Sequence, residues 1–373
     1  MTTSFIRRPA RILMTLDAVG GVWRYALDLA RELAARNVSV RLLGVGPAPG
    51  GAQAAEIAAF PWSWIDAPLD WMRGGLESLP RVHEAIDEAA RAFDADLLHL
   101  NALAHSHERL RAWPIVAFTH SCVPSWIAAM GGDVAESWCA THRAANAAGF
   151  RAADVVAAPS EAHARATAAL YGAGPLVRAV HNAVAPAPAS RRREPFVFAA
   201  GRWWDDAKNL RTLDEAAATT RWPVRLAGPL EGPNGERRTL RHAETLGVLD
   251  AQTTRETMAR AAIFVSPSAF EPFGLAALEA ASSGAALVLS DIPTYRELWE
   301  GAALFAPPKD AAAFARAIDQ LADDADLRAR LGFQARARAA RRTPARQADE
   351  MLRIYGEALR LRAPACAPAR EAV

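Results

Sequence analysis

Cysteine is scarce in this chain of 373 residues. The three cysteines, Cys122, Cys139 and Cys366, are odd in number and show no CxxC spacing. Neither a disulfide framework nor a zinc knuckle is therefore expected. Such sparse, unpaired cysteines fit a reducing compartment, and we expect a cytoplasmic protein.

The sequence also lacks an excess of charge of one sign and any long apolar run. Lys and Arg total 43 against 41 Asp and Glu, whereas nucleic-acid binders usually carry a basic excess, so no nucleic-acid partner is expected. The apolar run 12–16, which follows Arg7, Arg8 and Arg11, is too short for a signal peptide or a membrane span. No later stretch reaches about 18 apolar residues. We expect neither export nor a membrane span, which leaves peripheral contact with the inner face of a membrane open.

Short apolar runs alternate with longer helical patterns along most of the chain. ARILMTL (10–16) precedes the helical pattern WRYALDLARELAARN (23–37), and VSVRLLGVG (38–46) follows it. This βαβ rhythm is typical of a parallel sheet covered by helices on both faces. The segment 185–195, rich in proline and arginine, interrupts the rhythm and is predicted to be an exposed linker. Beyond it the rhythm restarts with FVFAAG (196–201).

The length and the linker together predict two domains, because 373 residues exceed one ordinary hydrophobic core. We expect an α/β protein with two Rossmann-like, doubly wound parallel-sheet domains, at residues 1–188 and 189–345. A cleft should separate them at the C-terminal ends of the strands, where ligands bind in such sheets.

Two carboxylates flank a turn in FEPFGLAALEAASSG (270–284). We expect Glu271 in a loop, Pro272 near the first helical position and free backbone amides beside the acids. Such a site suits a ligand that offers both phosphate oxygens and sugar hydroxyls. If the span were helical throughout, Glu271 and Glu279 would lie ~12 Å apart, roughly the reach from ribose to sugar in a nucleotide-sugar. An ordinary surface helix with two solvated glutamates is the alternative.

Two cations follow an apolar strand in AAGRWWDDAKNL (199–210). At the end of a strand, Arg202 and Lys208 can neutralise a diphosphate, the arginine through bidentate hydrogen bonds and the lysine as a point charge. Alternatively, they are surface charges paired with Asp205 and Asp206.

The N-terminal half offers two further candidates. Gly20 and Gly21 lie between the first strand and the first helix, where glycines let the backbone approach a ligand closely. The G-x-G-x-x-G spacing of a dinucleotide site is absent. His120 ends another strand and can face the cleft to hydrogen-bond a sugar hydroxyl, although a structural histidine explains it equally well.

Aromatic and basic residues outside these motifs allow two interpretations each. The segment 46–80 is predicted to be irregular, and its Trp62, Trp64 and Trp71 either contact an acceptor or form a satellite core. The region 311–362 is predicted to form Ala- and Arg-rich helices, whose arginines either meet phosphates or an anionic membrane or are simply solvated.

No metal site is predicted. Asp94-Ala95-Asp96 has the D-x-D spacing of metal-dependent sugar transferases, but it precedes an apolar strand and so lies at the wrong end for the cleft. His105 and His107 have no matching carboxylate. The G-x-S-x-G elbow and the P-loop are also absent.

Taken together, these motifs resemble the retaining glycosyltransferases of family 4, which have the GT-B fold. The glutamate pair and the Arg202…Lys208 pair are the specific motifs. Ala183 departs from the pattern, since the family often has glycine after the asparagine. The similarity covers most of the chain, through Gly20-Gly21, AAPSEAHA (157–164), HNAV (181–184), GRWWDDAKN (201–209), FEPFGLAALE (270–279) and SDIPTYREL (290–298).

The resemblance implies a role for each candidate residue. Glu271 matches a residue that binds hydroxyls of the donor sugar, and Glu279 matches one that binds the ribose. Arg202 and Lys208 would hold the diphosphate. The remaining expected contacts are the amides near Phe273, Gly274 and Leu275, and, from the other domain as the cleft closes, Gly20, Gly21 and His120. A helix within 346–373 would pack back on the N-terminal domain.

The resemblance further implies transfer of a hexose-type sugar from a nucleoside diphosphate to a hydroxyl of a glycan, glycolipid or small molecule, as in bacterial polysaccharide biosynthesis. Such enzymes need no metal cofactor and retain the anomeric configuration. The N-terminal motifs contain no obvious nucleophilic carboxylate, so same-face attack is favoured. A GT-B nucleotide-sugar epimerase and a non-catalytic nucleotide-sugar sensor are the alternatives. The sequence leaves open the base, the sugar, the acceptor and the oligomeric state.

Overall fold

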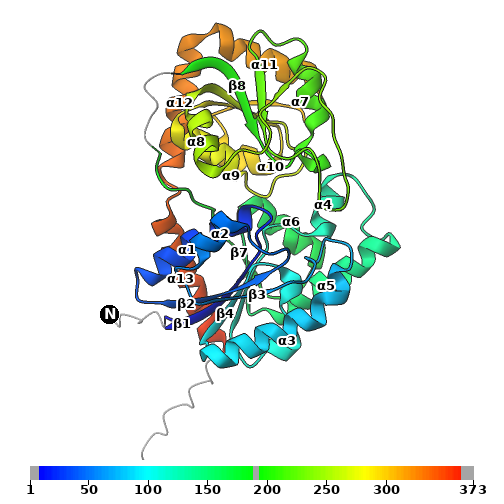
Figure 1. The fold of residues 1–373 in the computed structure, drawn as a ribbon, viewed down its shortest axis with the longest axis vertical. Helices are drawn as coiled ribbons and strands as arrows, with labels where there is room; N and C mark the ends of the chain where they lie inside the picture. Colours follow the sequence, from blue (N-terminus) through cyan, green and yellow to red (C-terminus); the bar gives the residue numbers. More distant parts are fainter. Residues whose placement is uncertain (1–7, 188–192, 363–373) are drawn as a thin grey trace, which may run out of the picture.

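The computed structural model describes residues 8–187 and 193–362. Two α/β domains stand one above the other in Figure 1, with the N-terminal domain below and the C-terminal domain above. Arg7, Cys366 and residues 188–192 of the predicted linker lie outside the described residues.

A parallel sheet forms the centre of the N-terminal domain. Its strands are β1 (Arg11–Leu16), β2 (Ser39–Val45), β3 (Trp62–Ile65), β4 (Leu97–Leu100), β5 (Ile115–Phe118), β6 (Val155–Ala158) and β7 (Leu176–Ala179). Within the described residues these seven strands follow the order β3-β2-β1-β4-β5-β6-β7. The strands β4 and β5 are buried throughout, as expected for a parallel sheet with helices on both faces.

A second parallel sheet forms the centre of the C-terminal domain. Its strands are β8 (Glu194–Ala200), β9 (Val224–Ala227), β10 (Glu244–Thr245), β11 (Ala261–Ser266), β12 (Ala286–Ser290) and β13 (Leu304–Ala306). In the part of the chain that the structure describes, the order is β10-β9-β8-β11-β12-β13. The two sheets confirm the predicted α/β class with two doubly wound domains.

Helices cover both sheets. In the N-terminal domain they are α1 (Gly21–Ala34), α2 (Gly51–Ile57), α3 (Gly75–Phe93), η1 (Leu103–His105), η2 (Glu108–Leu110), α4 (Val123–Ala129), α5 (Ser137–Ala152) and α6 (Glu161–Tyr171). Beyond β8 they are η3 (Asp206–Lys208), α7 (Leu210–Ala217), α8 (Ala251–Arg260), α9 (Leu275–Ser283), α10 (Pro293–Trp299), α11 (Ala311–Asp323), α12 (Ala325–Ala339) and α13 (Pro344–Leu361). The labels η1 to η3 mark short 3₁₀ turns.

The strand order reverses once in each sheet, between β1 and β4 and between β8 and β11. Connections leave such a switch point in opposite directions, so a crevice opens outside the strand ends there. The glycine pair follows β1, Arg202 follows β8 and Glu271 follows β11. The topology therefore brings these motifs to the two switch points.

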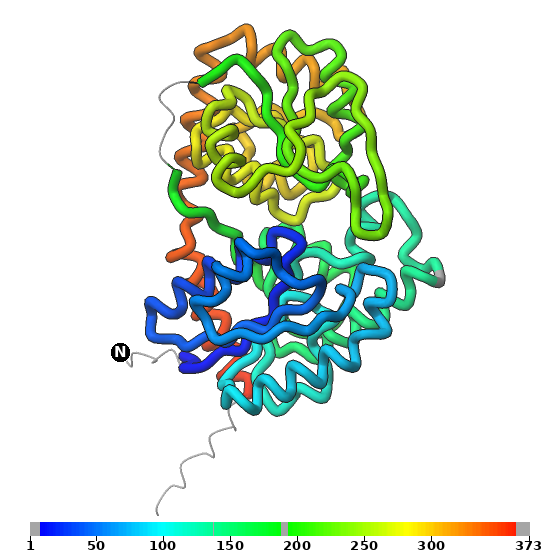
Figure 2. Tube along the Cα trace, in the orientation of Figure 1, coloured from blue at the N-terminus to red at the C-terminus, as the bar shows by residue number. Residues whose placement is uncertain are grey.

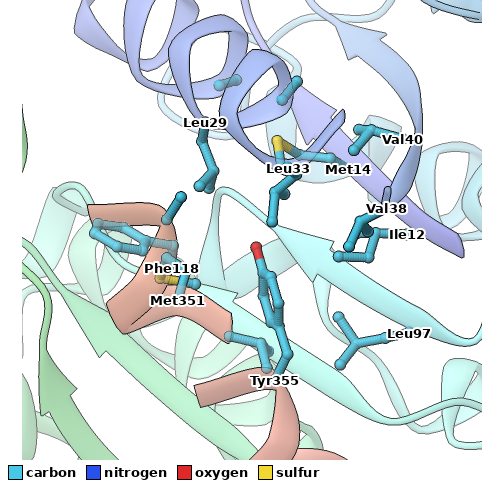
Figure 3. Packing of buried hydrophobic residues seen from close by; sticks show 14 of the residues in the cluster. Ile12, Met14, Leu29, Leu33, Val38, Val40, Leu97, Phe118, Met351 and Tyr355 are labelled. Atoms are coloured by element: carbon cyan, nitrogen blue, oxygen red, sulfur yellow. The ribbon is translucent and has the colours of Figure 1, made fainter. Parts of the chain in front are cut away.

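Helix α13, the last helix of the described residues, packs in the N-terminal domain. Figure 2 shows the chain passing from α12 in the upper domain down to α13 in the lower one. Met351 and Tyr355 of α13 are fully buried in the cluster that contains Leu33 and Leu97, and Figure 3 shows these side chains together. Arg36 secures the start of α13 through a hydrogen bond from Nη2 to the Ala345 carbonyl, 3.0 Å away.

The prediction that residues 46–80 are irregular was wrong. The segment contains α2, the edge strand β3 and the start of α3. Strand β3 is only four residues long, so its pattern is too short to stand out. Pro80 lies inside α3, and because proline usually interrupts a helix, the helical pattern that begins at Gly75 was not recognised.

The domains are joined by several polar contacts besides the chain itself. Glu297 of α10 accepts hydrogen bonds from the backbone amides of Glu161 and Ala162, at 3.0 and 2.7 Å. Ser160 Oγ donates to the Pro272 carbonyl at 2.7 Å. The first turn of α6 is thus anchored to the opposite domain.

No helix among the described residues combines the length and the apolar character needed to cross a membrane. Cys122 and Cys139 are both buried and reduced. Asp96 Oδ2 accepts hydrogen bonds from the amides of Ala10 and Arg11, both at 2.8 Å, and Asp94 ends α3 in a left-handed conformation. The D-x-D residues therefore form a turn at the far end of the sheet from the cleft.

Candidate active site

A cavity of about 430 Å³ lies between the two switch points. The N-terminal domain contributes the turn after β1 and the loops after β4 and β5. The C-terminal domain contributes the loops after β8 and β11 and the first turn of α9. Of the predicted site residues, those lining it are Gly20, Gly21, His120, Arg202, Lys208, Glu271, Phe273, Gly274 and Leu275.

The glycine pair touches the opposite domain. A Cβ atom at Gly20 would lie 3.0 Å from Arg202 Nη1, and one at Gly21 would lie 3.0 Å from Leu275 Cδ1. Gly20 has an extended backbone, φ −150°, that any residue adopts. Close approach between the domains, rather than backbone conformation, therefore favours glycine here.

Four charged side chains of the C-terminal domain meet in the cavity. Lys208, in η3, places Nζ 2.5 Å from Glu271 Oε2. Arg202 lies 3.5 Å from Asp205 Oδ2, and its guanidinium carbon is 5.4 Å from the centre of the Trp204 ring. Asp205 is also the residue that caps η3, through the amide of Ala207. The two cations thus lie in the same loop after β8, and each is paired with a carboxylate.

Helix α9 presents its N-terminus to the cavity. The helix begins at Leu275, and its N-cap, Gly274, has no side chain to bond the first amides. Phe273 to Ala276 line the cavity, so amides with a partial positive charge are available to an anion. The expectation that Pro272 lies near the first helical position was wrong, because Gly274 takes φ +92° and the helix starts one residue after it.

Gly274 is the position of this loop where another residue would not fit. Besides its left-handed backbone, a Cβ atom there would approach Tyr295 Cε1 to 2.7 Å. Tyr295 in turn bonds Ser266 Oγ, the two oxygens lying 2.6 Å apart. Burial raises the pKa of Tyr295 well above its ordinary value, and the charge of Glu271 raises it further. A rigid, neutral phenol therefore supports the turn.

Glu279 does not line the cavity. It lies in the second turn of α9, half-buried, near the charges of Arg24 in α1 and Arg255 in α8. Burial raises the pKa of Glu279, and the two arginines act against that rise. Its predicted contact with a ribose would thus occur at the edge of the cavity, beside α1.

His120 faces the cavity from the end of β5. Its ring is stacked on Phe118, with centroids 4.5 Å apart, and meets the edge of Tyr25 at 4.6 Å. Burial lowers the pKa of His120 to about 3, helped by the nearby His99 and His163. The imidazole is therefore neutral at physiological pH and can accept a hydrogen bond.

The three tryptophans that were considered as acceptor contacts lie in different surroundings in the structure. Trp71 lines the cavity and stacks on Trp204 of the other domain, with centroids 6.2 Å apart. Trp62 lies on the edge strand β3, and Trp64 packs against Trp23 in the core. The satellite-core interpretation fits Trp64, and Trp71 alone of the three can reach a ligand in the cavity.

The sequence interpretation missed several polar residues of the cavity. Asp17 and Asn101 directly follow β1 and β4, so their place at strand ends was the signal that could have found them. Burial raises the pKa of Asp17, and that of Asp70 to about 6. Asn182 is 5% exposed, and its Oδ1 has no partner in the described part of the chain. Trp126, the last of them, donates from Nε1 to Asp205 Oδ1 across the cleft at 3.0 Å.

Family models match both halves of the chain. Residues 19–187 match the model described as Glycosyltransferase Family 4, and residues 194–324 match the one described as Glycosyl transferases group 1. The fold and the two matches define the chain as a protein of the glycosyltransferase class with the GT-B architecture. It belongs to glycosyltransferase family 4.

Known proteins agree with this assignment. The glycogen synthase of Mycobacterium tuberculosis is 33% identical over 168 residues, which are 44% of this chain and 34% of that protein. The match thus spans about a third of the curated relative. Sucrose-phosphate synthase from Thermosynechococcus elongatus is 21% identical with a TM-score of 0.75, covering 94% of this chain and 98% of that chain.

Two further solved structures share the fold. Anabaena HepE, determined with UDP and glucose, has a TM-score of 0.68 at 18% identity, covering 92% of this chain and 98% of its own. WaaG, a glycosyltransferase involved in lipopolysaccharide biosynthesis, has a TM-score of 0.70 at 15% identity, covering 92% of this chain and 99% of its own. At these identities the likeness establishes the fold alone.

Proposed function

We propose that this protein is a retaining glycosyltransferase that moves a hexose-type sugar from a nucleoside diphosphate to a hydroxyl acceptor, without a metal cofactor. One observation carries the proposal. The cations Arg202 and Lys208, the uncapped amides of α9 and the carboxylate of Glu271 meet in one cavity, opposite His120. This set matches a ligand with a diphosphate at one end and hydroxyls at the other.

Each group has a role in the proposed reaction. Arg202, Lys208 and the α9 amides bind the diphosphate and stabilise the charge that develops on it as the glycosidic bond breaks, which lowers the barrier. Glu271 accepts hydrogen bonds from sugar hydroxyls, and His120 binds a hydroxyl from the opposite domain. Glu279, outside the cavity lining, binds the ribose where α9 meets α1.

The acceptor would enter from the N-terminal side of the cleft. Asp17, Asp70 and Trp71 line the cavity there, and they offer carboxylates and an aromatic face to a polyhydroxylated acceptor. The leaving phosphate accepts the proton of the attacking hydroxyl, on the face from which it departs. The anomeric configuration is retained in this way. HepE, which binds UDP and glucose, makes UDP-sugars the first donors to test.

Donor hydrolysis by the purified protein tests the proposal. Release of nucleotide is measured over UDP-, GDP- and ADP-sugars, with and without EDTA, beside Glu271→Ala. Slow release from one donor, insensitive to EDTA and lost in the variant, is expected. The anomer of the released or transferred sugar is then determined by NMR. Binding of a donor without turnover in any acceptor screen would favour a nucleotide-sugar sensor, and release of an epimerised sugar would favour an epimerase.

A further inference from the structure

The side chain of Asn101 has a fixed orientation beside His120. Asn101 Nδ2 donates to the Thr15 carbonyl at 2.6 Å. Because a backbone carbonyl only accepts, the amide nitrogen must face Thr15. Asn101 Oδ1 therefore faces the opposite way, 2.9 Å from His120 Nε2 and 3.1 Å from His99 Nε2.

This orientation decides where the two imidazoles carry their protons. An amide oxygen accepts and cannot donate, so both histidines must be protonated on Nε2. Burial lowers the pKa of His99 to about 4 and that of His120 to about 3. Each ring is consequently neutral with a single proton, and each Nδ1 is a bare acceptor.

Tyr355 of α13 adds a third hydrogen-bonding group to His99 and Asn101. Its hydroxyl lies 2.6 Å from His99 Nδ1, to which it donates. Figure 3 shows the ring of Tyr355 rising from α13 into the core. A continuous path of hydrogen bonds thus runs from α13 through His99 and Asn101 to His120, with donors and acceptors matched at every step. His120 Nδ1 ends this path, and it has no protein partner within the described residues.

We propose that Tyr355, His99 and Asn101 are positioning residues that hold His120 as the Nε2–H tautomer and leave its Nδ1 as the acceptor for a substrate hydroxyl. The identity of that substrate rests on the proposed function. The alternative tautomer would present an N–H to the hydroxyl and leave Asn101 Oδ1 facing a lone pair. The packing of α13 against the N-terminal domain thereby influences whether His120 presents a hydrogen-bond acceptor or a donor to the substrate.

Imidazole nitrogen NMR tests the proton positions without any substrate. The protein is labelled with ¹⁵N-histidine, and His120 is assigned from a His120→Gln spectrum. We expect a protonated Nε2 and an unprotonated Nδ1 for both His120 and His99, unchanged across neutral pH. In Tyr355→Phe, His99 loses the donor to its Nδ1 and can carry its proton there, which takes one of the two N–H donors away from Asn101 Oδ1. The His99 nitrogen signals should therefore shift towards mixed tautomers, and those of His120, which shares Asn101 Oδ1, should shift in the same direction by a smaller amount.

Kinetics with the active donor adds a readout that folding alone would not change. Tyr355→Phe should lower kcat about tenfold with KM for the donor nearly unchanged, because the His120 ring stays in place but is less often in the tautomer that accepts the hydroxyl proton. Tyr171→Phe is the matched control, since it removes another phenol hydroxyl of the same domain, one that contacts Cys122 Sγ. It should leave the His120 signals and kcat as in the wild type. Asn101→Ala should have a larger effect than Tyr355→Phe.

The outcomes separate this proposal from the proposed function. An Nδ1–H tautomer of His120 in the wild type, or His120 signals that Tyr355→Phe leaves unchanged, would overturn the positioning role. The expected tautomer and shifts in a protein that turns over no donor would instead support the positioning role and count against the transferase. Should Asn101→Ala fail to fold, Tyr355→Phe still decides the result.

Discussion

Lys208 Nζ lies 2.5 Å from Glu271 Oε2, and this ion pair joins the loop after β8 to the loop after β11. The two side chains are only 20% and 14% exposed. In the proposed function, the ammonium of Lys208 binds a phosphate of the nucleotide-sugar and the carboxylate of Glu271 binds its sugar hydroxyls. The ion pair therefore fixes the ammonium and the carboxylate relative to each other, and under the proposed function a bound donor must share or replace it.

Substitution of either partner should lower both the activity and the stability of the protein. Lys208→Met and Glu271→Gln should each lower kcat/KM by about 10²- to 10³-fold, because transition-state charge and sugar contacts are lost. Each should also lower the free energy of unfolding by about 1 to 3 kcal/mol, since one charge is left without its partner. The double variant should be less destabilised than the sum of the two.

Urea denaturation at neutral pH measures this coupling, with Arg211 and Glu215 as the control pair. Those side chains are 89% and 52% exposed on α7, so their double-mutant cycle should give coupling near zero. Strictly additive effects for Lys208 and Glu271 would contradict the interpretation.

The hydrogen bond from Trp126 to Asp205 should favour the closed cleft. It crosses between the domains at 3.0 Å, beside the stacked pair Trp71 and Trp204. Trp126→Phe removes a hydrogen bond that contributes about 1 kcal/mol. The equilibrium between the closed and an open form of the cleft should therefore shift about fivefold towards the open form. Small-angle X-ray scattering should report a larger radius of gyration.

Trp138→Phe is the matched control for that variant. Trp138 is 51% exposed and donates to Glu136 within its own domain, also at 3.0 Å. It should leave the scattering curve unchanged. Equal radii of gyration for Trp126→Phe and the wild type would show that the bond does not influence closure.

Much of this architecture could be predicted from the sequence because parallel strands are short, apolar and evenly spaced. The motifs at strand ends then fall at the switch points, which brought Arg202, Lys208, Glu271 and the glycine pair to one cavity. Contacts between distant segments could not be predicted. Nothing local in the sequence places Tyr355 against His99, or Trp126 against Asp205, since both contacts depend on how α13 and the two domains pack. Glu279 illustrates the same limit, because its helix was predicted but its neighbours Arg24 and Arg255 were not.

Asn182→Ala should weaken ligand binding without weakening the fold. Asn182 Oδ1 is buried without a partner in the described residues, and an unsatisfied buried acceptor destabilises the empty protein. The free energy of unfolding should therefore stay equal or rise slightly. Binding of the donor should weaken by about tenfold, since one hydrogen bond to the ligand is lost. Calorimetric titration and thermal unfolding of the same samples measure both effects; a fall in stability with unchanged affinity would assign Asn182 to the fold instead.

Glu297→Gln should loosen the contact between the domains. Burial raises the pKa of Glu297, but the hydrogen bonds from His181 and from the amides of Ala162 and Glu161 outweigh that and hold it below its ordinary value of 4.5. The carboxylate therefore stabilises the folded state above pH 4.5, and this contribution is lost as the pH falls through the lowered pKa. At pH 7 the variant should be less stable by about 1 to 2 kcal/mol. Denaturation curves should converge in acid, and a difference that persists there would point to packing rather than charge.

Asp70→Asn should stabilise the protein at neutral pH. Burial raises the pKa of Asp70 from 3.8 to about 6, the nearby Asp17 adds to the rise, and the amide of Trp71 opposes it. The folded state therefore holds a proton that the unfolded state releases, so the stabilising contribution of the protonated group is complete below pH 3.8 and is lost as the pH rises through 6. Asparagine cannot ionise and avoids that loss.

The difference in unfolding free energy between Asp70→Asn and the wild type should consequently be small at pH 4 and reach about 1 to 3 kcal/mol above pH 7. Asp66→Asn, at an exposed carboxylate four residues earlier, is the control for removing a negative charge from the same segment. Asp70 also lines the cavity on the side where we propose that the acceptor enters. Asp70→Asn should then lose affinity for the acceptor as it gains stability. A variant that gains stability and also binds the acceptor more tightly would show that the charge of Asp70 is not used in acceptor binding.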